Sequence, residues 1–328
     1  MAMIKVENLS KVYKIPKKRM GKFGTIRNIF SQVWEEKVAL NNISFSVDEG
    51  EILGYIGLNG AGKSTTLKIL TGVLYPTSGN VLVNNRVPHK NRVLNAKDIA
   101  FIAGQNISLE WDLPVVDSLQ LTKRIYQISD SQYYNNIELF DHLINLKEIM
   151  DVPVRQLSLG QKMRAGMANA LLHNPKIIYL DEPTIGIDVV AKESIRSFLK
   201  GYNKETKATI IMTSHDTRDI EDLCGRIIMI NKGELQFEGT IDMLNAQYMK
   251  YNRIINVQAK NDSFNLNLDN IKIKKYDNYY EIYYNCNEIS TESLVQLISE
   301  FDYDFEDVIV RKPNMEEIIK FMHEINSI

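Results

Sequence analysis

The sequence predicts an α/β fold, in which helices flank a parallel β-sheet and a smaller α+β domain follows. A glycine-rich loop over 57–64 separates an apolar run over 51–56 from a helix-forming run over 64–70. A second apolar run, over 177–182, ends in two acids. Because ligands of open α/β sheets bind beyond the carboxyl ends of the strands, the loop and the acids indicate one site.

The glycine-rich loop has the residues that phosphate binding requires. Glycine lets the backbone wrap closely, so that N–H groups and the N-terminus of the next helix point at the α- and β-phosphates. Lys63 is predicted to reach the β- and γ-phosphate oxygens, and the Ser64 hydroxyl to coordinate Mg²⁺. The alternative, a glycine-rich turn with an incidental lysine, fits poorly between a strand and a helix. The predicted contacts of this loop are Gly57, Asn59, Gly60, Ala61, Gly62, Lys63, Ser64 and Thr65.

The acids Asp181 and Glu182 follow a run that is typical of a central parallel strand. Asp181 is placed to hold Mg²⁺, and Glu182, which projects differently, to polarise the attacking water as general base. On their own these acids would equally fit an ordinary strand exit. Together with the phosphate loop they predict phosphoryl transfer, which needs positioning and charge neutralisation rather than a covalent nucleophile.

Residues 157–161, Leu-Ser-Leu-Gly-Gln, resemble the signature segment of ATP-binding cassette (ABC) proteins. Ser158 and the amides near Gly160 are predicted to cap a helix that runs through Gln161, and the positive end of its dipole suits a γ-phosphate. The resemblance implies that this phosphate belongs to ATP held by the other subunit of a dimer. The family pattern has two glycines after the serine. Leu159 replaces the first glycine, which leaves the cap in place and leaves open whether hydrolysis is slowed.

Four further positions match the family motifs in order along the chain, although each would carry no weight alone. Gln105 resembles the loop glutamine that touches Mg²⁺ or the lytic water, and His215 the switch histidine that orients Glu182 and the γ-phosphate. Asp188 resembles the loop aspartate at the dimer interface, and Tyr13 the aromatic that stacks on adenine. The resemblance therefore implies catalytic roles for Glu182, His215 and Gln105, nucleotide contacts at Tyr13, Ser158, Gly160, Gln161 and Asp188, and Mg²⁺ contacts at Ser64, Gln105 and Asp181.

The resemblance also implies a domain organisation and a function. It implies a P-loop NTPase cassette over 1–243, with a RecA-like core, an antiparallel β subdomain and a helical subdomain at about 106–172. A small α+β accessory domain over 244–328 follows. Because the chain has one set of motifs, two Mg²⁺-ATP would be sandwiched between two subunits, either as a homodimer or with a related subunit. The implied function is ATP hydrolysis that drives a separate multi-span permease, as an exporter of drug or antibiotic type.

Composition excludes several other classes of protein. The 328 residues are 44% hydrophobic and 24% charged, which is typical of a globular protein. The net charge of −2 offers no bulk attraction for nucleic acid, and two well-separated cysteines fit a reducing compartment. No signal peptide and no apolar stretch of about 18 residues is visible. We therefore expect the chain at the cytoplasmic face of a bacterial cell membrane, held there by its permease.

Residues 14–37 form an unusual insertion between strands predicted over 4–9 and 39–47, and it is too long for a hairpin loop. Basic residues dominate it, and five apolar residues recur at helical spacing. A basic amphipathic helix of this kind indicates docking on a membrane surface or a partner, and an ordinary surface helix is the alternative. The five apolar residues are Phe23, Ile26, Phe30, Val33 and Trp34.

The helical subdomain is predicted to contain amphipathic helices over 118–126 and 137–144. In the family this subdomain meets the permease, so the neighbouring segment 111–114 is a candidate docking surface. Trp111 fits a core role equally well.

The C-terminal domain is predicted from the spacing of its apolar residues, which follows the period of a strand in some segments and that of a helix in others. Strands are expected over 252–259, 279–284 and 305–310, and helices over 291–300 and 314–325. The arrangement resembles the C-terminal domain of multidrug-exporter cassettes, which helps to hold the dimer. Five tyrosines between 276 and 284 suit base stacking. Without a basic groove beside them, we favour a packed sheet face.

The subgroup that the chain resembles most is the viologen-exporter-like one, because of Leu159, the insertion and the segment 111–114. One alternative is a cassette protein of translation or DNA repair that needs no membrane partner. Such proteins carry two cassettes or a long coiled-coil arm, and neither is visible here. A second alternative is a regulatory module that binds nucleotide without turnover. Glu182 and His215 argue against it, whereas Leu159 keeps it open.

Overall fold

The chain divides into two compact units, Met1–Glu238 and Gly239–Ile328. The described residues of the first unit form two β-sheets and those of the second form one, and each unit has its own hydrophobic core. The computed structural model describes residues 2–16, 34–104, 108–214, 216–248, 251–259, 268, 270–276, 279–300, 305–314 and 317.

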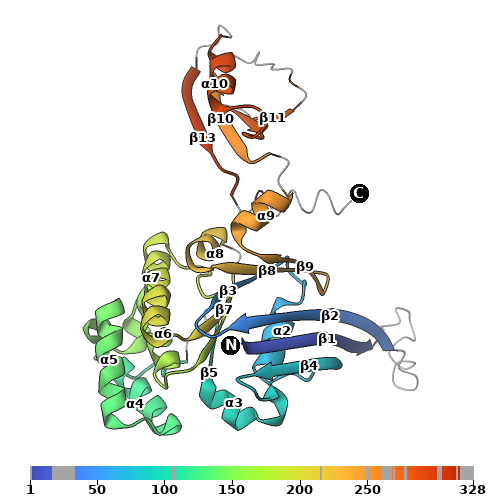
Figure 1. Ribbon diagram of the computed structural model, residues 1–328. Coiled ribbons are helices and arrows are strands. Elements are labelled where there is room, and N and C mark those ends of the chain that lie inside the picture. Colours follow the sequence, from blue (N-terminus) through green and yellow to red (C-terminus); the bar gives the residue numbers. More distant parts are fainter. Residues whose placement is uncertain are drawn as a thin grey trace, which may run out of the picture. The chain divides into compact units, whose positions relative to one another are not determined.

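The first sheet of the first unit is antiparallel, in the order β2-β1-β4. Its strands are β1 (Ala2–Pro16), β2 (Trp34–Asp48) and β4 (Ser78–Val83). The strands predicted over 4–9 and 39–47 are present but much longer, because the pairing of β1 with β2 continues as far as Pro16 and Trp34. Figure 1 shows β1 and β2 as two long neighbouring arrows.

The prediction of an amphipathic helix within 14–37 is wrong at Trp34, which lies in a strand. Pro16 ends β1 and Trp34 begins β2, where the indole is 53% exposed. Helical spacing of apolar residues is a local signal, whereas the hairpin is extended by cross-strand pairs such as Lys14 opposite Glu36, which bring opposite charges together. Outside the described residues lie the other four apolar positions, Phe23, Ile26, Phe30 and Val33.

The second sheet has six strands in the order β5-β6-β7-β3-β8-β9. The strands are β3 (Ile52–Ile56), β5 (Ile99–Ala103), β6 (Ile177–Asp181), β7 (Thr209–Thr213), β8 (Arg226–Asn231) and β9 (Glu234–Gly239). The pairs from β5 to β8 are parallel. This order brings together the carboxyl ends of β3, β6 and β7, which lead into the glycine-rich loop, Glu182 and Ser214.

Helix α2 (Lys63–Leu70) contacts β2 and β4 of the antiparallel sheet and β6 of the parallel sheet. Apolar side chains of both sheets and of α2 form one core, which includes Leu53, Leu67 and Ile228. The fully buried Tyr55 shares a 3.0 Å hydrogen bond with Thr66, which ties β3 to α2. The core therefore fixes the strand and the helix on either side of the glycine-rich loop.

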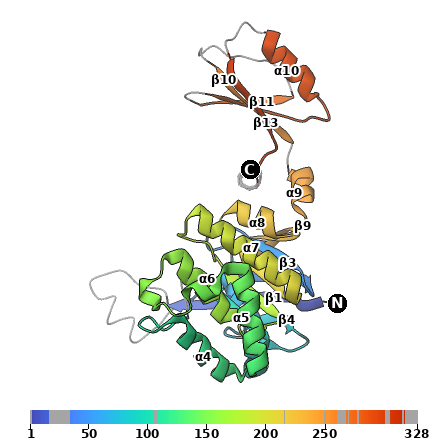
Figure 2. The same ribbon diagram turned by 90° about the vertical axis from the view of Figure 1, so that its left-hand side faces the viewer.

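The remaining helices of this unit include a helical lobe, α4 to α6, away from the antiparallel strands (Figures 1 and 2). The predicted helices over 118–126 and 137–144 are confirmed within α4 and α5. Rings of α5 and α7 pack together, and a Cβ on Gly201 of α7 would lie 2.6 Å from Leu143 of α5. The helices are η1 (Pro88–Lys90), α3 (Arg92–Asp98), α4 (Val115–Tyr126), α5 (Asp130–Ile144), η2 (Leu146–Ile149), η3 (Val154–Gln156), α6 (Leu159–Leu171), α7 (Val189–Thr206) and α8 (Thr217–Leu223).

The second unit has a four-stranded antiparallel sheet in the order β11-β12-β10-β13. Its strands are β10 (Arg253–Ala259), β11 (Ile271–Lys275), β12 (Tyr280–Tyr284) and β13 (Phe305–Arg311), and its helices are α9 (Ile241–Tyr248) and α10 (Thr291–Glu300). The three predicted strands and the helix over 291–300 are confirmed, whereas β11 was not predicted. The helix expected over 314–325 lies almost wholly outside the described residues.

The tyrosines of the second unit serve its core more than its surface. Tyr280 and Tyr284 pack with apolar side chains of α10 and the sheet, and Tyr283 is also buried. Tyr276 and Tyr279 are partly exposed and stack on each other at 4.6 Å. The packed sheet face is therefore confirmed for Tyr280 and Tyr284, whereas Tyr283, between Ile282 and Tyr284 on β12, is buried on the other face.

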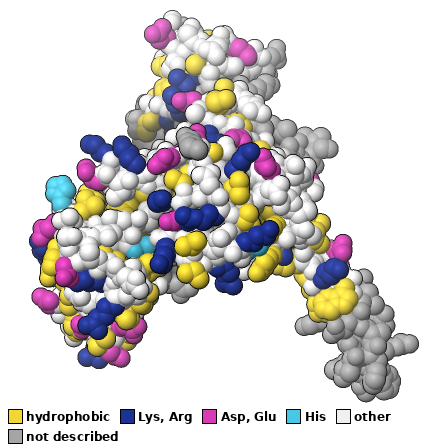
Figure 3. Space-filling model, turned by 60° about the horizontal axis from the view of Figure 1, so that its bottom comes forward, with side chains coloured by type: hydrophobic (Ala, Val, Ile, Leu, Met, Phe, Trp, Pro, Cys, Tyr) yellow, Lys and Arg dark blue, Asp and Glu magenta, His cyan; other side chains and the backbone are white. Residues whose placement is uncertain are grey.

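The surface of the described chain gives two further observations. On the face shown in Figure 3, Lys and Arg side chains alternate with Asp and Glu side chains and with apolar groups. Among the described residues, no helix has both the length and the apolar character that crossing a membrane requires.

Candidate nucleotide-binding site

The glycine-rich loop connects β3 to α2, as the sequence predicts. Gly62 precedes α2 with φ of 112°, a left-handed conformation that favours glycine. A Cβ at this position would lie 2.7 Å from the carbonyl oxygen of Ala39, so the loop also needs glycine for close packing. No side chain caps α2, and its first-turn N–H groups are therefore available to an anion.

Lys63 is held inside the loop. The side chain is buried, and its Nζ donates hydrogen bonds to the carbonyl oxygens of Gly57 (2.6 Å) and Leu58 (3.4 Å). Burial lowers the pKa of Lys63, whereas the nearby charges of Glu182 and Asp181 act to raise it. A poorly solvated ammonium group beside a cavity gains most from an anionic ligand, since a phosphate would replace the missing water.

Asp181 ends β6 and Glu182 follows it, and both residues are bonded to Thr213. The Thr213 hydroxyl donates to Oδ1 of Asp181 (2.7 Å), and the backbone N–H of Glu182 reaches the carbonyl oxygen and the hydroxyl of Thr213, each at 3.1 Å. Glu182 has φ of 57°, which is rare for a residue with a Cβ. Backbone in such a conformation persists where surrounding contacts impose it, and Thr213 supplies those contacts. The sequence analysis missed Thr213, which ends β7.

A cavity of about 430 Å³ unites much of the predicted site. Tyr13 contributes to the lining from β1, the glycine-rich loop contributes several residues, and Glu182 contributes from the position after β6. Six lining residues were not predicted, and most come from the extended hairpin of β1 and β2. The predicted lining residues are Tyr13, Asn59, Gly60, Gly62, Lys63, Ser64, Thr65 and Glu182, and the unpredicted ones are Lys14, Ile15, Lys37, Val38, Ala39 and Leu58.

Other predicted residues lie beside the cavity rather than in its lining. Gly57 lies under the loop, where a Cβ would be 2.2 Å from the carbonyl oxygen of Ile230, and Ala61 is buried in the core. Asp181 accepts a hydrogen bond from the Thr213 hydroxyl. Gln105 and His215 lie outside the described residues.

The signature segment forms the start of α6. Ser158 is the N-cap, and its Oγ accepts from the N–H of Gln161 (3.3 Å) while Oε1 of Gln161 accepts from the N–H of Ser158 (2.9 Å). The predicted cap is thus confirmed as a reciprocal capping box. Leu159 is the first helical residue, a position that tolerates a side chain. Gly160 cannot gain one, because its Cβ would lie 2.9 Å from Cβ of Ala191.

Asp188 caps the neighbouring helix α7 by accepting from the N–H of Ala191 (2.9 Å). The starts of α6 and α7 therefore meet at Gly160 and Ala191. Ser158, Gly160, Gln161 and Asp188 do not line the 430 Å³ cavity of their own chain.

Replacing Ser158 by Ala should separate the cap from a role at the nucleotide. Loss of the cap is expected to cost about 1 kcal/mol of stability. Loss of a phosphate contact should also lower the ATPase rate by on the order of 10²-fold. Ser129→Ala is the matched control, because Ser129 caps α5 with the same 3.3 Å geometry. Thermal unfolding and phosphate release would be measured for both variants, and equal rates would remove Ser158 from the site.

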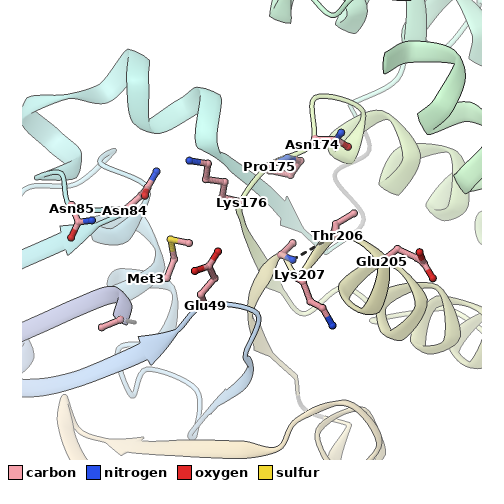
Figure 4. A pocket seen from close by; sticks show the side chains of 12 residues that line it. Met3, Glu49, Asn84, Asn85, Asn174, Pro175, Lys176, Glu205, Thr206 and Lys207 are labelled. Atoms are coloured by element: carbon pink, nitrogen blue, oxygen red, sulfur yellow. Dashed lines mark hydrogen bonds between the residues drawn. The ribbon is translucent and has the colours of Figure 1, made fainter. Parts of the chain in front are cut away.

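A larger hollow of about 590 Å³ lies at the opposite edge of the parallel sheet, among residues that precede β3, β6 and β7 (Figure 4). Side chains such as Glu49, Lys176 and Lys207 border it, and all three are exposed. None of the predicted site residues lines this hollow. The nucleotide site is therefore assigned to the smaller cavity, where the charged groups converge.

Comparison with known proteins identifies the family of the chain. A protein-family model described as "ABC transporter" matches residues 40–185. The ABC transporter ATP-binding protein NatA of Bacillus subtilis is 30% identical over 206 residues, which are 63% of this chain and 83% of NatA. The methionine import ATP-binding protein MetN of Histophilus somni is 30% identical over 242 residues, or 73% of this chain, and the chain spans 65% of the length of MetN.

A solved structure of an ATP-binding cassette also resembles this chain. The dimeric post-hydrolysis state of the ATP-binding cassette MJ0796, bound to ADP and Pi, aligns with a TM-score of 0.58 and 28% identity, over 73% of this chain and 99% of that one. The predicted cassette fold is therefore confirmed. The chain belongs to the family of ATP-binding proteins of ABC transporters.

Proposed function

We propose that this chain is the ATP-hydrolysing motor subunit of an ABC transporter, and that two copies close around two molecules of Mg²⁺-ATP. The observation that carries this proposal is the convergence of Tyr13, Lys63 and Glu182 on one cavity. These side chains come from three distant parts of the sequence, and they suit a base, a phosphate chain and an attacking water respectively.

The residues of the cavity fit ATP and Mg²⁺. The Tyr13 ring offers a stacking surface for adenine, and Lys63 with the first-turn amides of α2 offers donors for the phosphates. Ser64 and Asp181 provide the oxygen ligands that Mg²⁺ prefers. When bound, Mg²⁺ would neutralise charge on the β- and γ-phosphates.

Glu182 is the residue that we assign to water activation. Its backbone N–H is bonded to Thr213, so Glu182 lines the cavity from a fixed position directly after β6. A general base must lie within hydrogen-bond reach of the water whose proton it takes. Lys63 keeps the phosphates in place while Glu182 accepts that proton.

A second copy would supply the part of the site that this chain does not offer to its own nucleotide. Ser158 and the amides at the start of α6 form an anion-binding helix end outside the cavity. A head-to-tail pair would place each such end on the γ-phosphate of the partner. The dimeric structure of MJ0796 supports a pair of this kind.

The surface beside the helical lobe suits a membrane subunit. Trp111 is 58% exposed and Leu113 is 46% exposed, and Nζ of Lys162 lies 4.3 Å from the centroid of the Trp111 ring. Of the two roles considered for Trp111, the exposed position favours the interface. We propose a separate permease as the partner, which would hold the chain at the cytoplasmic face of the membrane.

Replacing Trp111 by Ala should weaken the association with the permease. Truncating a tryptophan at the centre of an interface typically costs about 2 kcal/mol or more, so the affinity is expected to fall by about 30-fold or more. Tyr134→Ala on α5 is the control, because Tyr134 is a similarly exposed aromatic residue. Retention of the permease during detergent purification measures the effect, and equal retention by both variants would contradict this docking surface.

Export, and the viologen-exporter-like subgroup, stay predictions from the sequence. The comparisons do not support this direction, since MetN is an import protein. Co-purification tests the transporter assignment: the chain is expressed with its chromosomal neighbours and extracted in mild detergent. A stoichiometric multi-span protein that changes the ATPase rate is the expected result. A chain that purifies alone would favour a cassette protein that needs no membrane partner.

A further inference from the structure

Asp219 on α8 lies at the centre of a buried polar network. Asp219 is 0% exposed, and its carboxylate accepts hydrogen bonds from three side chains. The Thr184 hydroxyl and the Ser214 hydroxyl (2.9 Å) both reach Oδ2, and Nη1 of Arg196 reaches Oδ1 at 2.9 Å. Thr184 and Arg196 are themselves 4% and 5% exposed.

Two of the three donors come from segments that carry predicted catalytic residues. Thr184 follows Glu182 by two residues, and Ser214 immediately precedes His215. Arg196 belongs to α7, the helix that Asp188 caps. One carboxylate therefore joins the exit of β6, the exit of β7 and helix α7.

A second ion pair reinforces the same junction. Nζ of Lys192 on α7 lies 2.6 Å from Oδ2 of Asp216, the residue that follows position 215. The N–H of Asp216 donates to the Ser214 hydroxyl at 3.0 Å. Both neighbours of position 215 are thus bonded to groups on α7 or α8.

We propose that Asp219 is a positioning residue for ATP hydrolysis, which holds the segment that bears Glu182 and the segment that bears His215 at a fixed separation. The proposal rests on the proposed function, because it needs Glu182 as the base. Charge-assisted hydrogen bonds in a buried network are directional and resist displacement. A displacement of about 1 Å at a catalytic group can lower the rate by 10²-fold.

Loss of this network is expected to lower the rate of ATP hydrolysis rather than the affinity for ATP. Thr184, Ser214, Arg196 and Asp219 do not line the nucleotide cavity, so they should contribute little to ATP affinity. Loss of the network should lower kcat and leave KM for ATP nearly unchanged. A residue that only stabilises the fold would instead lower the unfolding temperature without such a split.

The test compares Thr184→Val with Thr184→Ser in the full-length chain. Valine keeps the shape of threonine and removes the donor, whereas serine keeps the donor. The expected result is a fall in kcat of about 10- to 100-fold for Thr184→Val, with KM for ATP changed less than about threefold, and recovery of most of the rate in Thr184→Ser. Asp219→Asn should show the same split, and Thr184→Val keeps the proposal testable if Asp219→Asn does not fold.

Glu51→Gln is the matched control for losing a partly buried ion pair. Glu51 accepts from Nε of Arg226 at 2.7 Å, at the amino end of β3 and remote from the cavity. This variant should lower the unfolding temperature and leave kcat unchanged. Normal kcat in Thr184→Val would overturn the positioning role, and so would normal kcat in a folded Asp219→Asn. Glu182→Gln is assayed alongside, because normal turnover in that variant would instead overturn the proposed function.

Discussion

Glu182→Gln is expected to lower kcat for ATP by about 10²–10⁴-fold, the usual contribution of a positioned general base. The amide keeps the shape of the side chain but cannot accept the proton of the attacking water. The backbone of Glu182 would remain fixed by Thr213, since those hydrogen bonds use the main-chain N–H. ATP should therefore still bind, and turnover alone should be lost.

Phosphate release and the binding of a fluorescent ATP analogue separate these two effects. Glu205→Gln is a suitable control, because Glu205 is an exposed glutamate that borders the hollow at the far edge of the sheet. It should behave as the unmodified protein in both assays. Normal phosphate release by Glu182→Gln would remove Glu182 from its role as base.

Lys63→Ala is the second change with a large expected effect, and it acts on binding. Removing one partner of a buried charge pair costs about 2–5 kcal/mol, which corresponds to a Kd for ATP roughly 30-fold to several thousand-fold higher. Burial lowers the pKa of Lys63, and the nearby Glu182 and Asp181 only partly offset this effect. A bound phosphate would stabilise the buried ammonium group further.

The control for Lys63→Ala is Lys68→Ala, because Lys68 lies exposed on the same helix. Isothermal titration with Mg²⁺-ATP would measure both variants, and thermal unfolding would show that they are folded. If Lys63→Ala binds ATP as tightly as Lys68→Ala does, the phosphate-loop assignment is wrong.

The parts of the site that the sequence could predict depend on local order. The loop at 57–64 is recognisable because its strand, its glycines and its helix are consecutive. The same holds for the cap at Ser158, whose partner Gln161 is three residues away, and for the acids at the end of β6. In each case neighbouring residues determine the geometry.

The parts that could not be predicted depend on contacts between distant residues. Thr213 meets Asp181 across 32 positions, and Thr184 meets Asp219 across 35. No fixed spacing in the sequence identifies either contact. At Trp34 the sequence predicted a contact pattern that does not form. The apolar spacing around it is that of a helix, but Trp34 pairs with β1 as part of a strand. The hairpin that results adds several lining residues to the nucleotide cavity.

The central claim is that ATP is held between two copies of this chain. The most direct measurement is the molar mass of Glu182→Gln by size-exclusion chromatography with light scattering, with and without Mg²⁺-ATP. The proposal predicts the mass of one chain without nucleotide and twice that mass with it, and Lys63→Ala should stay at the mass of one chain. A Glu182→Gln protein that is saturated with ATP and still has the mass of one chain would contradict the account.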